Sequence, residues 1–137
     1  MTPSAIDSSI QVVADVFRSY RTELLGHFGQ AHFVRKRNRT PVTEWDIKIE
    51  KSVRRAIHAH DPSVGFEGEE TGRVGGRDRY WLVDPIDGTS SFIRGLDYTT
   101  NMAALVVNDE VVASVIYDFI RDHLFVAVKG RGATRDG

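Results

Sequence analysis

The chain has 137 residues, of which 18 are Lys or Arg and 19 are Asp or Glu, so its formal charge at pH 7 is −1. This length suits one domain with one hydrophobic core. The near balance of charge argues against a protein that coats nucleic acid or an anionic membrane surface, and we expect neither partner. The absence of cysteine excludes disulfides, thiolate catalysis and sulfur-ligated metals. Together with the lack of a secretory signal or a membrane-length apolar run, it favours a cytoplasmic protein.

Residues 6–28 are predicted to form a first helix. Their apolar side chains recur at alternating steps of three and four, which places them on one helix face. We expect Ser4 and Asp7 to cap its start, and Gly26 or Gly29 to stop it. The apolar stripe consists of Ile6, Ile10, Val13, Phe17, Tyr20, Leu24 and Phe28.

A second helix is predicted to begin at Thr43, because Thr43 and Asp46 have the spacing of a capping box. Its end is expected at Asp61, before Pro62, since the residue that precedes a proline avoids helical geometry. The buried stripe of this helix would consist of Trp45, Ile49, Val53 and Ile57.

Beyond Pro62 the apolar runs become as short as strands. The links between the last three runs are too short for the crossover that parallel neighbours need, so an antiparallel meander is predicted. The expected fold is α+β, with two N-terminal helices packed on one face of a largely antiparallel sheet. Residues 130–137 read as a loop. The predicted strands are residues 64–66, 80–83, 98–107, 111–117 and 124–128.

Two carboxylates follow the strand predicted at residues 80–83. Asp84 and Asp87 are separated by a proline and an isoleucine, and Gly88 then allows a sharp turn whose N–H groups could face an anion. Asp-Pro and Asp-Gly are also ordinary turn dipeptides, so in isolation this segment has an equally simple structural explanation.

Glu69 and Glu70 add a further acidic point after a short predicted strand, although such a pair is often only a solvated edge. Two like charges about 4 Å apart repel by roughly 4 kcal/mol at an effective dielectric constant near 20. If Glu69, Asp84 and Asp87 converge, they therefore need a cation. Oxygen ligands without imidazole or thiolate favour Mg²⁺, with Mn²⁺ as an alternative, over zinc.

Four motifs in this order resemble those of the inositol monophosphatase family, whose relatives include fructose bisphosphatase and bisphosphate nucleotidase. The resemblance covers essentially the whole chain. It implies that residues 1–137 are the N-terminal domain of the layered αβαβα sugar-phosphatase fold, with the C-terminal half absent. The motifs are Val42-Thr43-Glu44-Trp45-Asp46, Gly68-Glu69-Glu70, Val83-Asp84-Pro85-Ile86-Asp87-Gly88-Thr89 and Gly130-Arg131-Gly132-Ala133.

The resemblance implies a metal site. Glu69, Asp84 and the carbonyl oxygen of Ile86 would hold a first Mg²⁺ ion. Asp84 and Asp87 would begin a second site, and Asp87 would also contact the substrate. Glu69 is counted among the catalytic residues.

The resemblance also assigns roles around the phosphate. The N–H groups of Gly88 and Thr89 would bind it, and Lys36 is the best match for a lysine near the metal. The catalytic pair Asp46 and Thr89 would orient or deprotonate a metal-activated water that attacks phosphorus directly.

Simpler explanations compete for several of these residues. Asp46 suits the third position of a helix for capping reasons alone. Glu50 is interpreted as an ion-pair partner of Arg54, without a catalytic role. The basic run at residues 35–39 is a weak footprint for nucleic acid, and a solvated loop explains it. The histidines form no metal-binding pair.

The expected activity is Mg²⁺-dependent hydrolysis of a small phosphate monoester, foremost inositol monophosphate. Histidinol phosphate, a sugar phosphate or a nucleotide are alternatives within the family. Complete members are expected to be homodimers, and lithium sensitivity is common among them. The family's second half supplies a further aspartate and most of the substrate pocket, so a non-catalytic metal- or partner-binding module is a second hypothesis, and a calcium-binding structural domain is a third.

Overall fold

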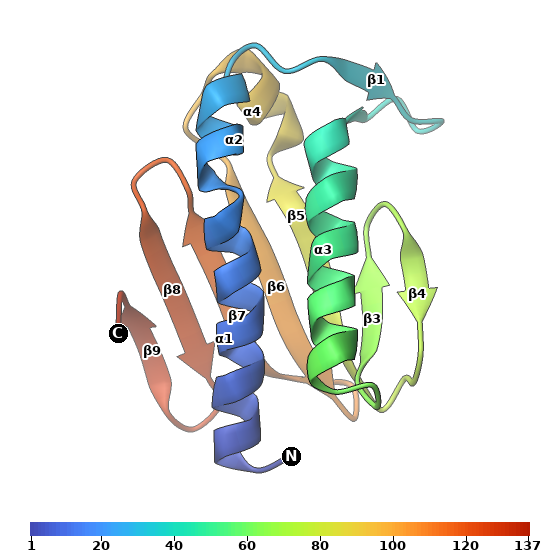
Figure 1. Cartoon of the computed structure of the whole chain (residues 1–137), viewed down its shortest axis with the longest axis vertical. Helices are drawn as coiled ribbons and strands as arrows, with labels where there is room; N and C mark the ends of the chain where they lie inside the picture. Colours follow the sequence, from blue (N-terminus) through green and yellow to red (C-terminus); the bar gives the residue numbers. More distant parts are fainter.

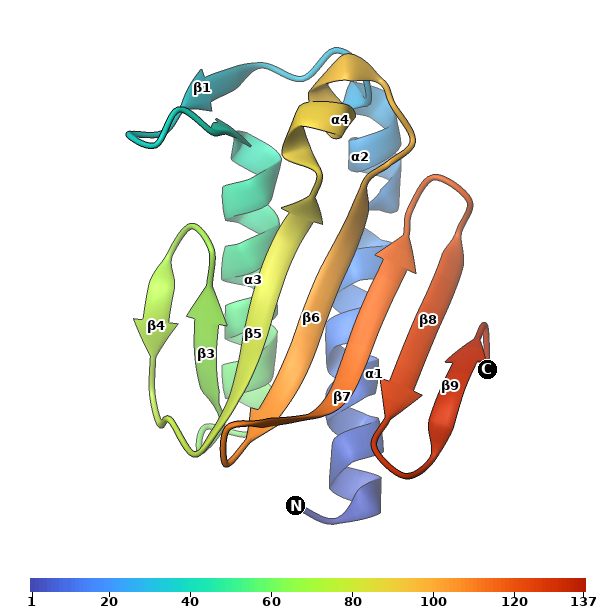
Figure 2. The ribbon, with the colours of Figure 1, turned by 180° about the vertical axis from the view of Figure 1, so that it is seen from behind.

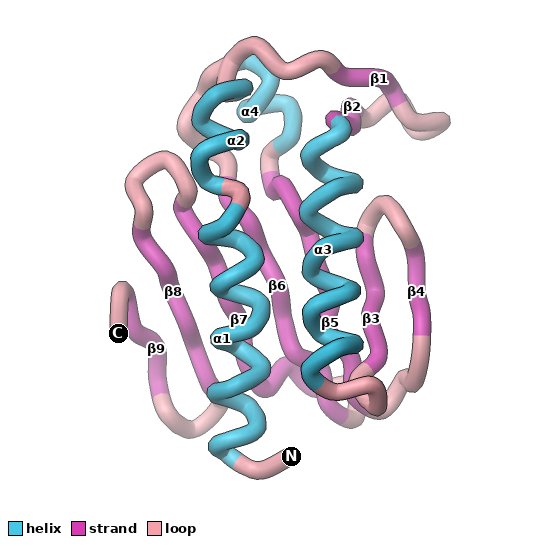
Figure 3. The backbone as a smooth tube through the Cα atoms, in the orientation of Figure 1, coloured by secondary structure: helices cyan, strands magenta, loops and turns pink.

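A computed structural model describes residues 1–137. Helices pack on one face of a seven-stranded sheet (Figure 1), and the view from behind shows no helix over the other face (Figure 2). The tube in Figure 3 separates these two layers by colour. The expected α+β fold is confirmed. The helices are α1 (Pro3–Ser19), α2 (Arg21–His27), α3 (Glu44–His60) and α4 (Thr89–Arg94); the strands are β1 (Phe33–Arg35), β2 (Pro41–Thr43), β3 (Gly65–Gly68), β4 (Gly72–Val74), β5 (Arg79–Asp87), β6 (Thr100–Val107), β7 (Glu110–Asp118), β8 (His123–Val128) and β9 (Gly132–Arg135).

The first predicted helix is two helices, α1 and α2, with a break at Tyr20. The N-cap is Thr2, whose hydroxyl accepts a hydrogen bond from Ala5 N at 3.2 Å, so the expected cap at Ser4 was wrong. Pro3 explains the earlier start, because proline fits the first turn of a helix, where its missing N–H costs nothing. Gly29, with φ of 76°, lies just beyond α2, close to where a stop was expected.

Helix α3 begins and ends where the sequence predicted. Thr43 is its N-cap, and the reciprocal hydrogen bonds with Asp46 complete a capping box. Asp61 follows the last helical residue. The capping box was readable because both of its partners lie within one turn of the chain.

The sheet has the order β4-β3-β5-β6-β7-β8-β9. From β5 onward it is the antiparallel meander that the short connections predicted. Strand β3 instead pairs parallel with β5, because the β3–β4 hairpin first turns the chain back on itself. The expected terminal loop contains β9, which pairs with β8.

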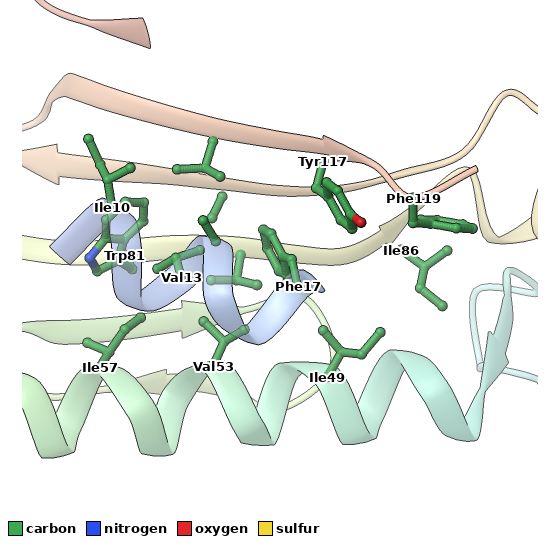
Figure 4. Close-up of a cluster of buried hydrophobic side chains, with 14 of the residues drawn as sticks. Ile10, Val13, Phe17, Ile49, Val53, Ile57, Trp81, Ile86, Tyr117 and Phe119 are labelled. Carbon is green, nitrogen blue, oxygen red and sulfur yellow. The ribbon is translucent and has the colours of Figure 1, made fainter. Parts of the chain in front are cut away.

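The core lies between α1, α3 and the covered face of the sheet (Figure 4). Trp81 of β5 is fully buried there, and its indole N–H donates to Ser9 of α1 at 2.8 Å. Phe17 of α1 and Ile49 of α3 are equally inaccessible to solvent. This packing makes β5 a firm support for the carboxylates at its end.

The uncovered face of the sheet presents apolar side chains to solvent. Leu82 is 44% exposed, although it is flanked along β5 by the buried Trp81. A groove of about 160 Å³ runs along this face and reaches the site at the end of β5. It is lined by Leu82, Asp84, Met102, Ala103, Ala104, Ser114 and Ile116.

Candidate metal centre

The end of β5 departs from regular pairing at the two predicted carboxylates. Asp84 pairs with Met102 and Asp87 with Thr100, and the register shifts between them. Gly88 then adopts a left-handed conformation, with φ of 72°, and caps α4. Such a bulge turns a strand out of its regular line, which here bends the acidic segment away from the ladder.

Side chains replace the ladder hydrogen bonds that the bulge removes. Three successive carbonyl groups, at residues 85–87, each accept a hydrogen bond from a side chain. These backbone groups therefore have partners although they lie outside the regular ladder. Two of the donors come from β6 or its entry, so β6 holds the acidic loop in place. The hydrogen bonds are Asn101 Nδ2 to Pro85 O (2.7 Å), Thr89 Oγ1 to Ile86 O (3.0 Å) and Thr99 Oγ1 to Asp87 O (2.8 Å).

Asp84 is the most perturbed carboxyl group of the centre. Burial, together with the neighbouring charges of Glu69, Asp87 and Asp46, raises its pKa to about 8. Its Oδ1 atom is buried and has no hydrogen-bond partner. A buried carboxylate oxygen without a partner beside other acids is what a cation would stabilise, so the donor chemistry fits a hard metal ion.

Lys36 reaches the same acids from the loop between β1 and β2. Its Nζ donates to Glu70 Oε1 at 2.9 Å and lies 3.7 Å from Glu69 Oε1. Burial lowers the pKa of Lys36, but the hydrogen bond and charge of Glu70 outweigh it, so the pKa is raised. Lys36 thus contributes a fixed positive charge beside Glu69.

Thr89 Oγ1 lies 2.9 Å from Asp46 Oδ1 and 3.0 Å from Ile86 O, so its single proton is shared between these two acceptors and links Thr89 to Asp46. The other carboxylate oxygen, Oδ2, accepts from the N–H and hydroxyl of Thr43 at 2.8 and 2.6 Å. Burial raises the pKa of Asp46, although these hydrogen bonds oppose it. Capping and contact with Thr89 therefore coexist, because the two oxygens of Asp46 serve different partners.

Glu50 does not have the role inferred from sequence. Its side chain is fully buried, and its carboxylate accepts hydrogen bonds from the backbone N–H groups of Glu70 and Thr71. The expected ion pair with Arg54 is absent from the salt bridges of this chain, so that interpretation was wrong. Helical spacing suggested Arg54, whereas the turn that Glu50 binds is remote in sequence.

The acids do not form a closed ligand set by themselves, since no group of three Asp, Glu, His or Cys side chains is assembled to hold a metal ion. Glu69 projects outward, with 51% of its side chain exposed. The charges of Glu69, Asp87 and Asp46 nevertheless each raise the pKa of Asp84, so these acids are neighbours although they do not converge on one point. The residues that sequence reasoning missed are the supports Glu50, Thr99 and Asn101.

The fold and the oxygen-rich site define an α+β protein with a candidate centre for a hard divalent cation. The family model described as "Inositol monophosphatase family" matches residues 1–137. Nus factor SuhB of Xylella fastidiosa is 32% identical over 128 residues, covering 91% of this chain and 46% of that protein. Histidinol-phosphatase of Chlorobaculum parvum is 41% identical over 103 residues, covering 74% and 40%. The chain belongs to the inositol monophosphatase family.

Solved structures agree with this assignment. The extragenic suppressor protein suhB of Bartonella henselae superposes with a TM-score of 0.84 at 30% identity, over 94% of this chain and 51% of that one. An IMPase of Thermotoga maritima gives 0.81 at 30% identity, over 96% and 51%. The chain thus spans about half the length of these structures and less than half of the curated relatives above.

No helix of the chain combines the length and apolar character needed to cross a membrane.

Proposed function

We propose that this chain forms the metal-binding half of a magnesium-dependent phosphatase that hydrolyses a small phosphate monoester. Membership of the inositol monophosphatase family supports the reaction class. The observation that carries the proposal is the buried, unpartnered Oδ1 of Asp84 beside Glu69 and Asp87. Three neighbouring acids in one chain are costly without a cation.

We propose Glu69, Asp84 and the Ile86 carbonyl as ligands of one ion, and Asp84 with Asp87 as the start of a second site. Bound Mg²⁺, or Mn²⁺ in its place, supplies positive charge that offsets these acids and polarises the phosphate. Asp84, with its unpartnered oxygen, is the residue that both sites share.

The remaining residues would act on the substrate and on water. The Thr89 hydroxyl donates to Asp46, so its lone pairs can accept a hydrogen bond from water and orient it toward phosphorus. The backbone N–H groups of Gly88 and Thr89 would bind phosphate oxygens. Lys36 adds positive charge near Glu69. Asp87 would accept a hydrogen bond from a hydroxyl group of the substrate.

Inositol monophosphate is the proposed substrate. A curated relative, inositol monophosphatase 1 of Sus scrofa, is 36% identical over 101 residues, covering 70% of this chain and 36% of that protein. The 41% identity to a histidinol-phosphatase supports histidinol phosphate as the second candidate. We also propose a cytoplasmic protein, and the absence of cysteine is compatible with a reducing compartment. We further propose that residues 1–137 form the N-terminal half of the family's fold and that the complete protein is a homodimer.

The test is phosphate release from both substrates with Mg²⁺ or with EDTA, for the complete protein that contains this half and for its Asp84→Asn variant. We expect Mg²⁺-dependent phosphate release that falls by at least about 100-fold in the variant, because the anionic carboxylate proposed to bind the metal becomes a neutral amide. Undiminished turnover by Asp84→Asn would exclude the proposed centre. The ratio of the two substrates' kcat/KM values decides between them.

A further inference from the structure

The loop between β3 and β4 is closed around a buried carboxylate from another element. Gly68 pairs with Gly72 across the hairpin, and the loop between them carries Glu69. Glu50, which α3 contributes, is fully buried against this loop. Its Oε2 accepts from Glu70 N at 2.9 Å, and its Oε1 accepts from Thr71 N at 2.6 Å and from Thr71 Oγ1 at 2.5 Å.

Gly68 makes this arrangement possible. A Cβ atom at position 68 would lie 1.8 Å from Glu50 Oε1 and 2.2 Å from Glu50 Cδ, far inside van der Waals contact. Any larger residue at position 68 would therefore have to displace the Glu50 carboxylate from its hydrogen bonds to the loop. The first residue of the Gly68-Glu69-Glu70 motif thus has a partner on α3.

The backbone of Glu69 is held from both sides. Its own N–H donates to Val83 O at 3.3 Å, and Val83 directly precedes Asp84 on β5. The next N–H along the chain, that of Glu70, donates to Glu50. Glu69 is consequently placed relative to Asp84 by one contact to β5 and one to α3.

A carboxylate suits this position better than an amide would. All three groups that face Glu50 are donors, and a carboxylate is a pure acceptor with two equivalent oxygens. Glutamine would turn its own NH₂ group toward at least one of these donors. The pattern requires the charge and not only the shape of the side chain.

We propose that Glu50 is a positioning residue for the metal ligand Glu69, acting through the backbone of the β3–β4 loop. The inference rests on the proposed metal centre. Preorganised outer partners of metal ligands commonly change metal affinity by tenfold or more when they are replaced. Glu50 would act comparably, by holding the backbone that directly follows Glu69.

The experiment uses the full chain and Mn²⁺ alone as the probe, with free Mn²⁺ followed by electron paramagnetic resonance. We expect Glu50→Gln to raise the Mn²⁺ dissociation constant at least about tenfold. In the metal-free protein, hydrogen exchange at the N–H groups of Glu70 and Thr71 should accelerate at least about tenfold. Ser9→Ala is the control, because it removes a buried hydrogen bond between α1 and Trp81 that involves no residue of the β3–β4 loop, and it should lower Tm without changing Mn²⁺ affinity.

Thr71→Val carries the test if Glu50→Gln fails to fold, since it removes one hydrogen bond and keeps the shape. It should weaken Mn²⁺ binding about threefold. Unchanged affinity and exchange in the folded variants would overturn the role of Glu50 while leaving the metal centre in place. If the wild-type chain binds Mn²⁺ no better than Asp84→Asn, the proposed function itself fails, and this inference with it.

Discussion

At the scale of single residues, the chemistry of the site is concentrated on Asp84. Its pKa of about 8 lies far above the ordinary value of 3.8, because burial and neighbouring acids disfavour its charge. Between pH 3.8 and about 8, the Asp84 carboxyl group therefore keeps its proton in the folded protein but has released it in the unfolded chain. Stability contributed by this group is complete below about pH 4 and is lost as the pH rises toward 8.

We predict that the metal-free protein loses stability between pH 5 and 8.5. Thermal unfolding in EDTA should show a fall in Tm of at least about 4 °C across this range. Asp84→Asn should reduce the fall, since asparagine does not titrate. The pKa values of Asp46 and Glu70 are also raised by burial, so a smaller slope of the same sign should persist.

Comparison of the two proteins reports the titration of Asp84 together with the acids that interact with it, because the titrating groups elsewhere are common to both. Asp61 and Asp136 have lowered pKa values, so their contributions are lost only in acid, outside the range measured. Equal slopes for wild type and Asp84→Asn would contradict the prediction.

Gly88 is expected to be intolerant of substitution. A Cβ atom there would lie 2.4 Å from the Tyr98 carbonyl oxygen, and φ is already 72°. We predict that Gly88→Ala lowers the free energy of unfolding by about 3 kcal/mol, from strain and overlap together. Gly130→Ala is the matched control: its φ is 75° but nothing lies within 4 Å, so about 1 kcal/mol is expected. Urea unfolding measures both, and equal losses would mean that the overlap is relieved at little cost.

At the scale of elements, periodicity predicted which faces are buried better than where each helix ends. The stripe of the first predicted helix continues through Tyr20, although the chain bends there and starts α2. Both halves keep their apolar residues on the core side, which is why one continuous pattern described two helices. Strands β4 and β9 have exposed side chains and lack the apolar run that revealed the others. Strand β1 does contain Phe33 and Val34, but it is only three residues long and both side chains are exposed.

Helix α2 offers a direct test of this packing. Leu24 is fully buried, whereas its neighbour Leu25 is 37% exposed. We predict that Leu24→Ala lowers the free energy of unfolding by about 2 to 4 kcal/mol, since it opens a cavity in the core. Leu25→Ala should cost about 1 kcal/mol or less. Urea unfolding compares them, and a similar loss for both would show that α2 is not anchored through Leu24.

At the scale of the whole molecule, the candidate centre joins parts that are distant in the chain. The β3–β4 loop carries Glu69, the end of β5 carries Asp84 and Asp87, and the start of α3 carries Asp46. A cation held among them would connect these elements in the folded state only. Metal binding should therefore stabilise the entire fold.

We predict that 10 mM Mg²⁺ at pH 8 raises Tm by at least about 5 °C relative to EDTA at matched ionic strength, if that concentration is near 100 times the dissociation constant. Asp84→Asn should show no such increase. Differential scanning calorimetry measures the shift. An equal increase in both proteins would indicate a general effect of the salt.

Local chemistry made much of this protein predictable from its sequence. Three features depend on residues that are close in the chain and could therefore be predicted from the sequence. They are the helical stripes, the meander from β5 onward and the capping box of α3. The order of the four motifs along the chain also indicated the family. The candidate site residues were named from the same motifs.

Other features depended on contacts that only three-dimensional packing creates. Nothing near Glu50 in sequence indicates that it binds the N–H groups of Glu70 and Thr71, about twenty residues away. The parallel pairing of β3 with β5 and the support of Pro85 by Asn101 are of the same kind. The geometry of a single helix or strand sets the local periodicity of its sequence. Long-range hydrogen bonds and the pKa values of the carboxyl groups depend instead on which elements come into contact, and these contacts form only when the helices pack on the sheet.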